Sequence, residues 1–321
     1  MPVPHIPAEV LDHICAHVSR DSSSEKYFTK ISHREIRLKT LHSLTLTSRA
    51  FYNTCIPYLY HILSDDIIND FVGLARRLST APELSKHVSK IEKHIRKATE
   101  TRELISTLFH ACADIKELSI TTDRPLHISV KARSIPHTRL TCIYIYTTGG
   151  MGQTELAGFL AACPNLEEFE LSGEDARFYN GTESVSPSGV MQALEPCSKT
   201  LRSLCLYYYP HHAHTRMTQG NQIASHDDYI SDLRHFTKLE SLDVLKHDMV
   251  VLDKFPVSLK ELEIGHIPAD QVDEVRNLAR RASEHIPNLR RVILRGPVTP
   301  AFKPLKSIYK AANIEFEVNG H

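Results

Sequence analysis

The chain has 321 residues, with 38 basic and 38 acidic side chains and a formal net charge of +0. This balance argues against nucleic-acid binding as the main task, because no bulk positive field is present to neutralise phosphates. No apolar stretch of about 18 residues occurs, so no membrane span is expected. The length predicts two domains or one extended array.

The first element expected is an amphipathic helix over residues 5–18. Pro7 fits its first turn, where a missing N–H costs nothing, and Glu9 lies near the positive end of the helix dipole. Spacings of three and four residues predict one apolar stripe, made of Val10, Leu11, Ile14, Cys15 and Val18. A helix this short needs a partner surface for that stripe.

The stretch 19–40 is rich in serine and charge and is expected to be a loop or insertion. Helical spacing resumes over 41–48, and Ser48 is a candidate N-cap for a further helix carrying Phe51. Pro57 is expected to break that helix. About 60 residues therefore form three short helices, which is small for an independent core.

The second half of the chain repeats one pattern, in which a first apolar residue is followed by apolar residues three and five positions later. The first apolar positions are Ile115, Leu140, Leu166, Leu201, Leu239, Leu259 and Leu289. Their mean period is about 29 residues, within the leucine-rich-repeat range. Each copy predicts a short strand with one apolar face, which is buried only when copies stack in parallel.

Helical stretches lie between these predicted strands. Residues 154–164 form one, with Thr154 as a plausible N-cap and Pro164 as its end, and residues 270–288 form another. A last strand is expected over 313–320, and residues 73–95 are interpreted as a degenerate first repeat that caps the array. This alternation resembles the leucine-rich-repeat family over residues 105–318.

The N-terminal segments "IPAEVLDHICAHV" and "LTLTSRAFYNTCIPYLYHIL" resemble the F-box of fungal F-box proteins, with a longer insertion between the two halves. The resemblance implies binding to the Skp adaptor of a cullin-based SCF-type ubiquitin ligase. The adaptor-binding positions that it implies are Ile6, Pro7, Val10, Leu11, Ile14, Leu44, Leu46, Ser48 and Phe51. A different interpretation of the same stripe is plain core packing within one continuous helical domain.

We therefore expect an α/β protein: an F-box-like helical domain over 1–64, a helical linker or cap over 65–104, and an irregular leucine-rich-repeat-like solenoid with a parallel sheet over 105–321. The function expected is substrate recognition for the ligase. The alternative is a leucine-rich-repeat scaffold without a ligase role. The seven cysteines lack any CxxC pair, so buried reduced thiols are expected, in the cytoplasm, the nucleus or both.

Three stretches carry residues that could do chemistry. The first holds His211, His212 and His214, the second is the glycine-rich segment 147–155, and the third is "SHDDY" at 225–229. None has the spacing of a metal site, a phosphate loop or a catalytic constellation. The chain is therefore not expected to be an enzyme or to hold a metal or cofactor.

The residues that alternate with the apolar ones should form one outward surface across the stacked strands. Tyrosines and carboxylates dominate it, and two arginines, Arg291 and Arg295, come only at its end. We predict that it binds a protein target with a basic segment. The target-binding residues expected are Tyr144, Tyr146, Glu168, Glu170, Tyr207 and Asp243. The alternative is that these are ordinary exposed strand residues and that recognition lies elsewhere, in the long loops around 175–190 and 210–228.

Overall fold

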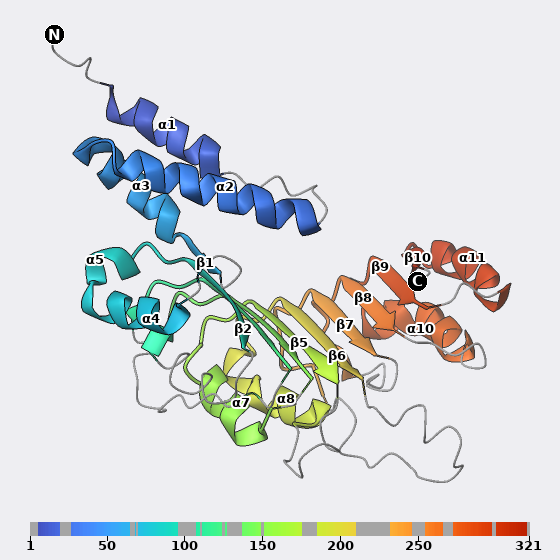
Figure 1. Cartoon of the computed structure of the whole chain (residues 1–321). Helices are drawn as coiled ribbons and strands as arrows, with labels where there is room; N and C mark the ends of the chain where they lie inside the picture. The colour runs from blue at the N-terminus through green and yellow to red at the C-terminus, as the bar shows by residue number, and fades with distance from the viewer. Residues whose placement is uncertain are drawn as a thin grey trace. The chain divides into compact units, whose positions relative to one another are not determined.

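A computed structural model places ten strands in a single sheet. The strands follow one another in chain order, and neighbouring strands pair in parallel (Figure 1). The predicted α/β class with a parallel sheet is therefore confirmed. The residues described are 6–19, 27–64, 68, 70–95, 107–109, 111–123, 126, 137–148, 151–174, 185–209, 232–245, 254–265, 272–296 and 300–319.

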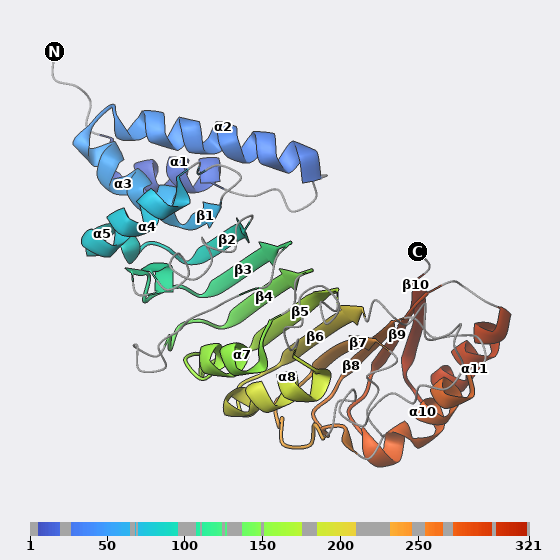
Figure 2. The same cartoon turned by 60° about the horizontal axis from the view of Figure 1, so that its bottom comes forward.

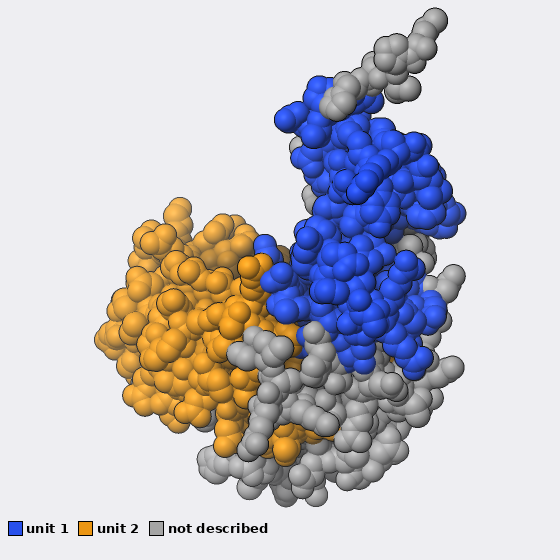
Figure 3. Space-filling view, turned by 90° about the vertical axis from the view of Figure 1, so that its left-hand side faces the viewer, with its two compact units in different colours: residues 1–94, 103–119 blue, residues 95–102, 120–321 orange. Residues whose placement is uncertain are grey.

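By compactness the chain divides into two units, residues 1–94 with 103–119 and residues 95–102 with 120–321 (Figure 3). In chain order, the first unit contains α1 (Ala8–Ser19), α2 (Tyr27–Thr45), α3 (Arg49–Tyr60), β1 (Ile62–Ser64), α4 (Phe71–Thr80), α5 (Pro82–Ser85) and β2 (Lys90–Ile95). The division falls at the end of β2 and within β3 (Glu117–Thr122). The segment 65–104, expected to be helical, thus also contains a strand.

The second unit continues the alternation of strands and helices. Its elements are β4 (Cys142–Thr147), α7 (Gln153–Leu160), β5 (Glu168–Glu174), α8 (Pro187–Ala193), η2 (Glu195–Cys197), β6 (Ser203–Tyr209), β7 (Ser241–Leu245), β8 (Glu261–Gly265), α10 (Val272–His285), β9 (Arg291–Arg295), η7 (Pro300–Phe302), α11 (Lys303–Ala311) and β10 (Glu315–Asn319). Helices α7, α8, α10 and α11 lie on one side of these strands (Figure 2).

The expectation of a loop over 19–40 is wrong for the part that the structure describes, because α1 reaches Ser19 and α2 occupies residues 27–40. Two interactions explain the helix. Leu41 is 1% exposed and anchors its C-terminal half in a core. The side chains of Glu35 and Lys39, one turn apart, form an ion pair of 2.7 Å on the solvent side. The high charge content of this segment was therefore a poor guide, because its described residues form a helix.

Pro57 does not end α3, which runs on to Tyr60 with the proline inside it. A proline in a helix interior removes one backbone hydrogen bond and costs about 3 kcal/mol. Residues on both sides of it, Cys55 before and Tyr58 and Leu59 after, pack into the same hydrophobic cluster. This burial offsets the missing backbone hydrogen bond, so the helix continues beyond Pro57.

All seven strands predicted from the repeat are present as β3 to β9, and the last predicted strand is β10. Burial alternates along β3 to β8 as the pattern requires, whereas in β9 the three successive residues Val292, Ile293 and Leu294 are all buried. Leu262 and Ile264 of β8 are each 0% exposed, and Leu242 and Val244 occupy the matching positions of β7. Equivalent apolar residues therefore stack in rows, each closed by the next strand.

The two helices expected between strands are also present, although one of their caps differs. Leu156, Phe159 and Leu160 of α7 are each 0% exposed, as the stripe predicts. The predicted cap is wrong, because α7 begins at Gln153 and Gly152 occupies its N-cap position without a side-chain hydrogen bond. Helix α10 buries its predicted residues Val272, Val275, Leu278 and Ala279.

A side-chain hydrogen bond recurs between successive turns of the second unit. The residue just before the first apolar position donates a hydrogen bond to a backbone carbonyl of the preceding turn. Asn165 Nδ2 bonds the Thr138 carbonyl and Asn288 Nδ2 bonds the Val257 carbonyl, both at 2.8 Å. Thr200 Oγ1 reaches the Pro164 carbonyl at 3.2 Å. These bonds satisfy carbonyls that the parallel ladder leaves unpaired.

Candidate interaction surfaces

Helix α1 has two apolar sides rather than the single stripe expected. Leu11 is 3% exposed and Cys15 is 0% exposed, whereas Val10 is 47% and Ile14 38% exposed. At about 100° per residue, Val10 and Ile14 lie about 40° apart, and Leu11 and Cys15 lie further round the helix. Ile6, two residues before the helix begins, is 43% exposed. One side thus packs internally and the other faces solvent.

The internal side closes a small core with the other two helices. Cys15, Leu41 and Cys55 form its buried centre, and the partly buried residues around it are Val18, Leu44, Phe51, Tyr58 and Leu59. The thiols of Cys15 and Cys55 lie in contact, with 3.0 Å between their Sγ atoms. Burial, and then the neighbouring thiol, raise the pKa of Cys55 to about 12, so it remains a thiol at neutral pH.

One polar bond supports this packing at the surface. The Tyr58 hydroxyl of α3 donates to Asp12 Oδ1 of α1 at 2.8 Å. Burial, followed by this bond to a carboxylate, raises the pKa of Tyr58 to about 12. The bond joins α1 to α3 in the orientation that leaves Val10 exposed.

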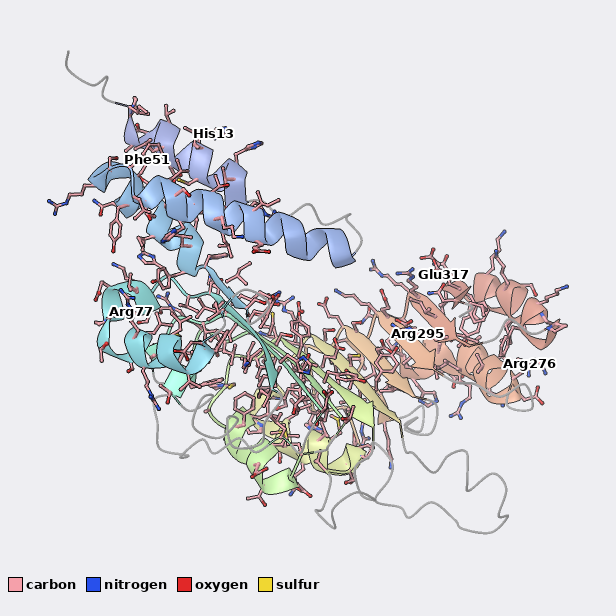
Figure 4. All side chains as sticks on the ribbon, viewed as in Figure 1. His13, Phe51, Arg77, Arg276, Arg295 and Glu317 are labelled. Atoms are coloured by element: carbon pink, nitrogen blue, oxygen red, sulfur yellow. The ribbon has the colours of Figure 1, made fainter. Side chains whose placement is uncertain are left out.

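The nine residues that the resemblance assigns to adaptor binding therefore differ in their exposure to solvent. Ile6, Pro7, Val10, Ile14, Leu46 and Ser48 are exposed, and Leu46 is the most exposed apolar side chain among them at 76%. Leu44 and Phe51 are half-buried against the internal core, and Leu11 is buried. Ser48 is the N-cap predicted for α3, and its Oγ accepts a hydrogen bond from the Phe51 N–H at 3.2 Å. Figure 4 shows Phe51 on α3 and His13 on α1.

The outward residues of the second unit form three rows across the strands. One row aligns Glu168, Ser203, Ser241, Glu261, Arg291 and Glu315. The next aligns Tyr144, Glu170, Cys205, Asp243, Glu263, Ile293 and Glu317, of which Ile293 is buried. The third contains Tyr146, Ser172 and Tyr207 on β4 to β6, and Gly265, Arg295 and Asn319 on β8 to β10. The six predicted target-binding residues all lie in these rows, which we call the open strand face.

Four of those six residues gather on two neighbouring strands. Tyr144 and Tyr146 come from β4, and Glu168 and Glu170 come from β5. The Tyr144 hydroxyl donates to Glu168 Oε2 at 2.8 Å. Tyr146 is 44% exposed, which is high for an aromatic side chain on a sheet. We call these four residues the β4–β5 patch.

The other two target-binding residues, Tyr207 and Asp243, belong to a cluster built around Arg295. The Tyr207 hydroxyl donates to Asp243 Oδ1 at 2.6 Å, and Arg295 Nη2 donates to Asp243 Oδ2 at 3.0 Å. Arg295 Nε also bonds Glu263 Oε1, and the Arg295 guanidinium lies 4.7 Å from the centre of the Tyr207 ring. Cys205 Sγ lies 3.7 Å from Asp243 Oδ2. Four strands are thereby joined through one arginine.

The cluster shifts the ionisation of its members. Burial raises the pKa of the Asp243 carboxyl to about 6, and the charge of Glu263 adds to the rise. The hydrogen bond from Tyr207 and the charge of Arg295 act in the opposite direction. Burial and the hydrogen bond to Asp243 also raise the pKa of the Tyr207 phenol. Asp243 thus titrates much closer to neutrality than an exposed aspartate.

The sequence interpretation treats Arg295 only as part of a terminal basic pair and does not predict its contacts across the sheet. The sequence does contain a signal for those contacts. Tyr207 and Arg295 each lie six residues after the first apolar residue of their repeat, so they share one row. Gly265 occupies the same row on β8 and has no side chain, which leaves room for the guanidinium to extend towards β6.

The stretches considered for chemistry fall largely outside the described residues. His211, His212 and His214, the segment 225–229 and Gly149–Gly150 are among those not described. Gly152 lies at the N-cap position of α7. Within the part of the chain that the structure describes, no group of three or more His, Cys, Asp or Glu side chains is placed to hold a metal ion. Among the same residues, no helix has the length and apolar character needed to cross a membrane.

No protein-family model matches the chain, and a search of curated proteins finds no match in sequence.

Proposed function

We propose that this chain is the substrate-recognition subunit of an SCF-type ubiquitin ligase. Helices α1 to α3 bind the Skp adaptor, and the open strand face holds a protein target for the cullin-based machinery. In this role the chain performs no bond chemistry itself. The finer folds implied, an F-box and a leucine-rich-repeat-like solenoid, belong to the same proposal.

The observation that carries the proposal is the outward apolar side of α1. Ile6, Val10 and Ile14 are spaced four residues apart, and each is between 38% and 47% exposed. A single exposed apolar residue needs no explanation, but Val10 and Ile14 one turn apart on α1, with Ile6 just before the helix, are typical of an interaction surface. These three positions are also among those that the F-box resemblance assigns to the adaptor.

The stacked strands support the second half of the proposal. Parallel strands in chain order, each burying its apolar row under the next, are what an array of leucine-rich repeats requires. Such arrays present the outward residues of consecutive strands as one continuous surface. The tyrosines of that surface suit protein recognition, because they add contact area at little cost in conformational entropy.

The adaptor half is tested by capture of a recombinant Skp adaptor on the immobilised full chain. We expect the double variant Val10→Asp/Ile14→Asp to lose capture by at least about tenfold, because it places two charges in a desolvated interface. Leu11→Asp does not serve this purpose, because Leu11 is buried and its substitution would disrupt the three helices themselves.

The matched control is Arg77→Asp on α4, which is exposed and changes the net charge by the same two units. Circular dichroism shows whether each variant keeps its helical signal. A folded Val10→Asp/Ile14→Asp protein that captures the adaptor as well as wild type would contradict the ligase role and favour a scaffold without it.

A further inference from the structure

The Arg295 cluster is an internal example of how the open strand face binds a guanidinium group. The planar cation lies over the ring of Tyr207, and the carboxylates of Asp243 and Glu263 receive its N–H groups. Ring and carboxylates come from three neighbouring strands. Arginine suits such a site better than lysine, because its flat fork stacks on an aromatic ring while donating to carboxylates.

The β4–β5 patch contains the same chemical groups without a described cation. Two tyrosine rings, Tyr144 and Tyr146, stand beside two carboxylates, Glu168 and Glu170, on the adjacent strand. The register pairs Tyr144 directly with Glu170, and the Tyr144 hydroxyl bonds Glu168. Paired positions on adjacent strands are about 5 Å apart, which is within the span of one guanidinium group.

Charge separates the two ends of the face. At the β9 end, Arg295 pairs with Asp243 and Glu263, and Arg291 pairs with Glu317 at 2.9 Å. At the β4–β5 end, no lysine or arginine of the described residues lies within ion-pair distance of Glu168 or Glu170. Within the described residues, the arginines of the face therefore pair with acidic residues of β7, β8 and β10 rather than with Glu168 or Glu170.

We propose that the β4–β5 patch binds an arginine side chain of the partner protein, stacked on a tyrosine ring and held by Glu168 and Glu170. This inference rests on the proposed function only in that the partner is then the ligase target. It narrows the expected basic segment to an arginine, and the contact to one end of the open strand face.

The probe is an acetylated five-residue peptide with one central arginine between glycine and serine residues. It is titrated into the full chain carrying ¹³C-labelled tyrosine rings, and NMR follows the rings, assigned through Tyr144→Phe and Tyr146→Phe. We expect the Tyr144 and Tyr146 signals to shift. A peptide with citrulline in place of arginine, which keeps the shape and removes the charge, should shift neither.

Two variants test the residues named. Glu168→Gln/Glu170→Gln should raise the Kd of the arginine peptide about three- to tenfold, because two exposed carboxylate contacts are lost. Tyr146→Ala should raise it about two- to fivefold through loss of ring stacking. Glu195→Gln/Glu284→Gln is the matched control: it removes the same charge from exposed positions outside the open strand face and should leave the Kd unchanged.

Equal binding of the arginine and citrulline peptides would overturn the proposal, as would equal binding of a lysine peptide or an unchanged Kd in both patch variants. An equal loss in the Glu195→Gln/Glu284→Gln control would also overturn it, because binding would then follow net charge alone. These readouts do not involve the adaptor. Failure of adaptor capture would therefore remove the ligase role without touching this site, and the reverse holds as well.

Discussion

The three N-terminal helices and the stacked strands bury their apolar residues in different ways. The helices share one small core, with Cys15, Leu41 and Cys55 at its centre, and leave Val10 and Ile14 in solvent. Each strand of the second unit is instead covered by the next, so that Leu242 and Leu262 are both 0% exposed. A small helical core has few inward positions, whereas an array gains one set with every copy.

The difference has a consequence for function. In the helices, Val10 and Ile14 stay exposed and form the surface that we propose for the adaptor. In the strands the apolar rows are buried, so we propose that recognition of a target depends on the polar and aromatic residues that alternate with them. The two regions therefore offer an apolar surface and a charged aromatic surface, respectively.

The largest expected effect tests the stacked rows. Leu262→Ala should lower the free energy of unfolding by about 2 to 5 kcal/mol, because the cavity lies between strands that cannot close over it. Urea unfolding followed by circular dichroism measures the loss, and hydrogen exchange should rise over β7 to β9. Val257→Ala, at a position 64% exposed, should stay within about 0.5 kcal/mol of wild type. Equal losses in the two variants would refute the burial pattern.

The same comparison within one helix separates the two sides of α1. Leu11→Ala should lower the free energy of unfolding by about 2 to 3 kcal/mol, because the Leu11 side chain is 3% exposed and its truncation leaves a cavity. Val10→Ala, one residue earlier, should cost about 0.5 kcal/mol or less. Hydrogen exchange over α1 to α3 is the local measurement. A larger effect at Val10 than at Leu11 would show that the helix is rotated.

The pH dependence of stability tests the Arg295 cluster. The pKa of Asp243 is about 6 in the folded protein, against 3.8 for an unperturbed aspartate. Between these two pH values the folded state therefore binds more protons than the unfolded state. The stability gained in this way is fully present below about pH 4 and is lost as pH rises through 6. The unfolding free energy of wild type minus that of Asp243→Asn should therefore decrease as the pH is raised from 4 to 7.

Asp232 provides the control for that measurement. Its hydrogen bond from Arg234 lowers the pKa of the carboxyl to about 2, so its contribution is lost only as pH falls below the ordinary aspartate range. Asp232→Asn should show no comparable change between pH 4 and pH 7. A flat difference for Asp243→Asn across this range would mean that the desolvation of Asp243 is balanced by its partners.

The smallest expected effect concerns the cap of α3. Ser48→Ala removes the acceptor for the Phe51 N–H and should cost about 1 kcal/mol, measured by urea unfolding. Ser48→Asn retains a capping oxygen and should restore most of the loss. An alanine variant as stable as wild type would indicate that water replaces the serine hydroxyl at this helix end.

Sequence-based prediction succeeded where periodicity and burial coincide. The seven repeat strands and α10 were all predicted, because each buries every apolar residue that its pattern contains. It failed where packing overrides a local signal. Pro57 lies inside α3 because residues around it are buried, and the charged segment at 27–40 is helical because Leu41 anchors it.

The sequence by itself determined the parallel strands, the alternation of inward and outward residues, and the equivalent repeat positions of Tyr207 and Arg295. Those features follow from spacing, which is local. Only the tertiary structure decided which side of α1 is internal, because Leu11 and Val10 are equally apolar and the choice depends on what α2 and α3 place opposite them. Likewise, only the structure shows that Arg295 is paired with Asp243 and Glu263, because a long side chain can reach across strands in ways that spacing does not encode.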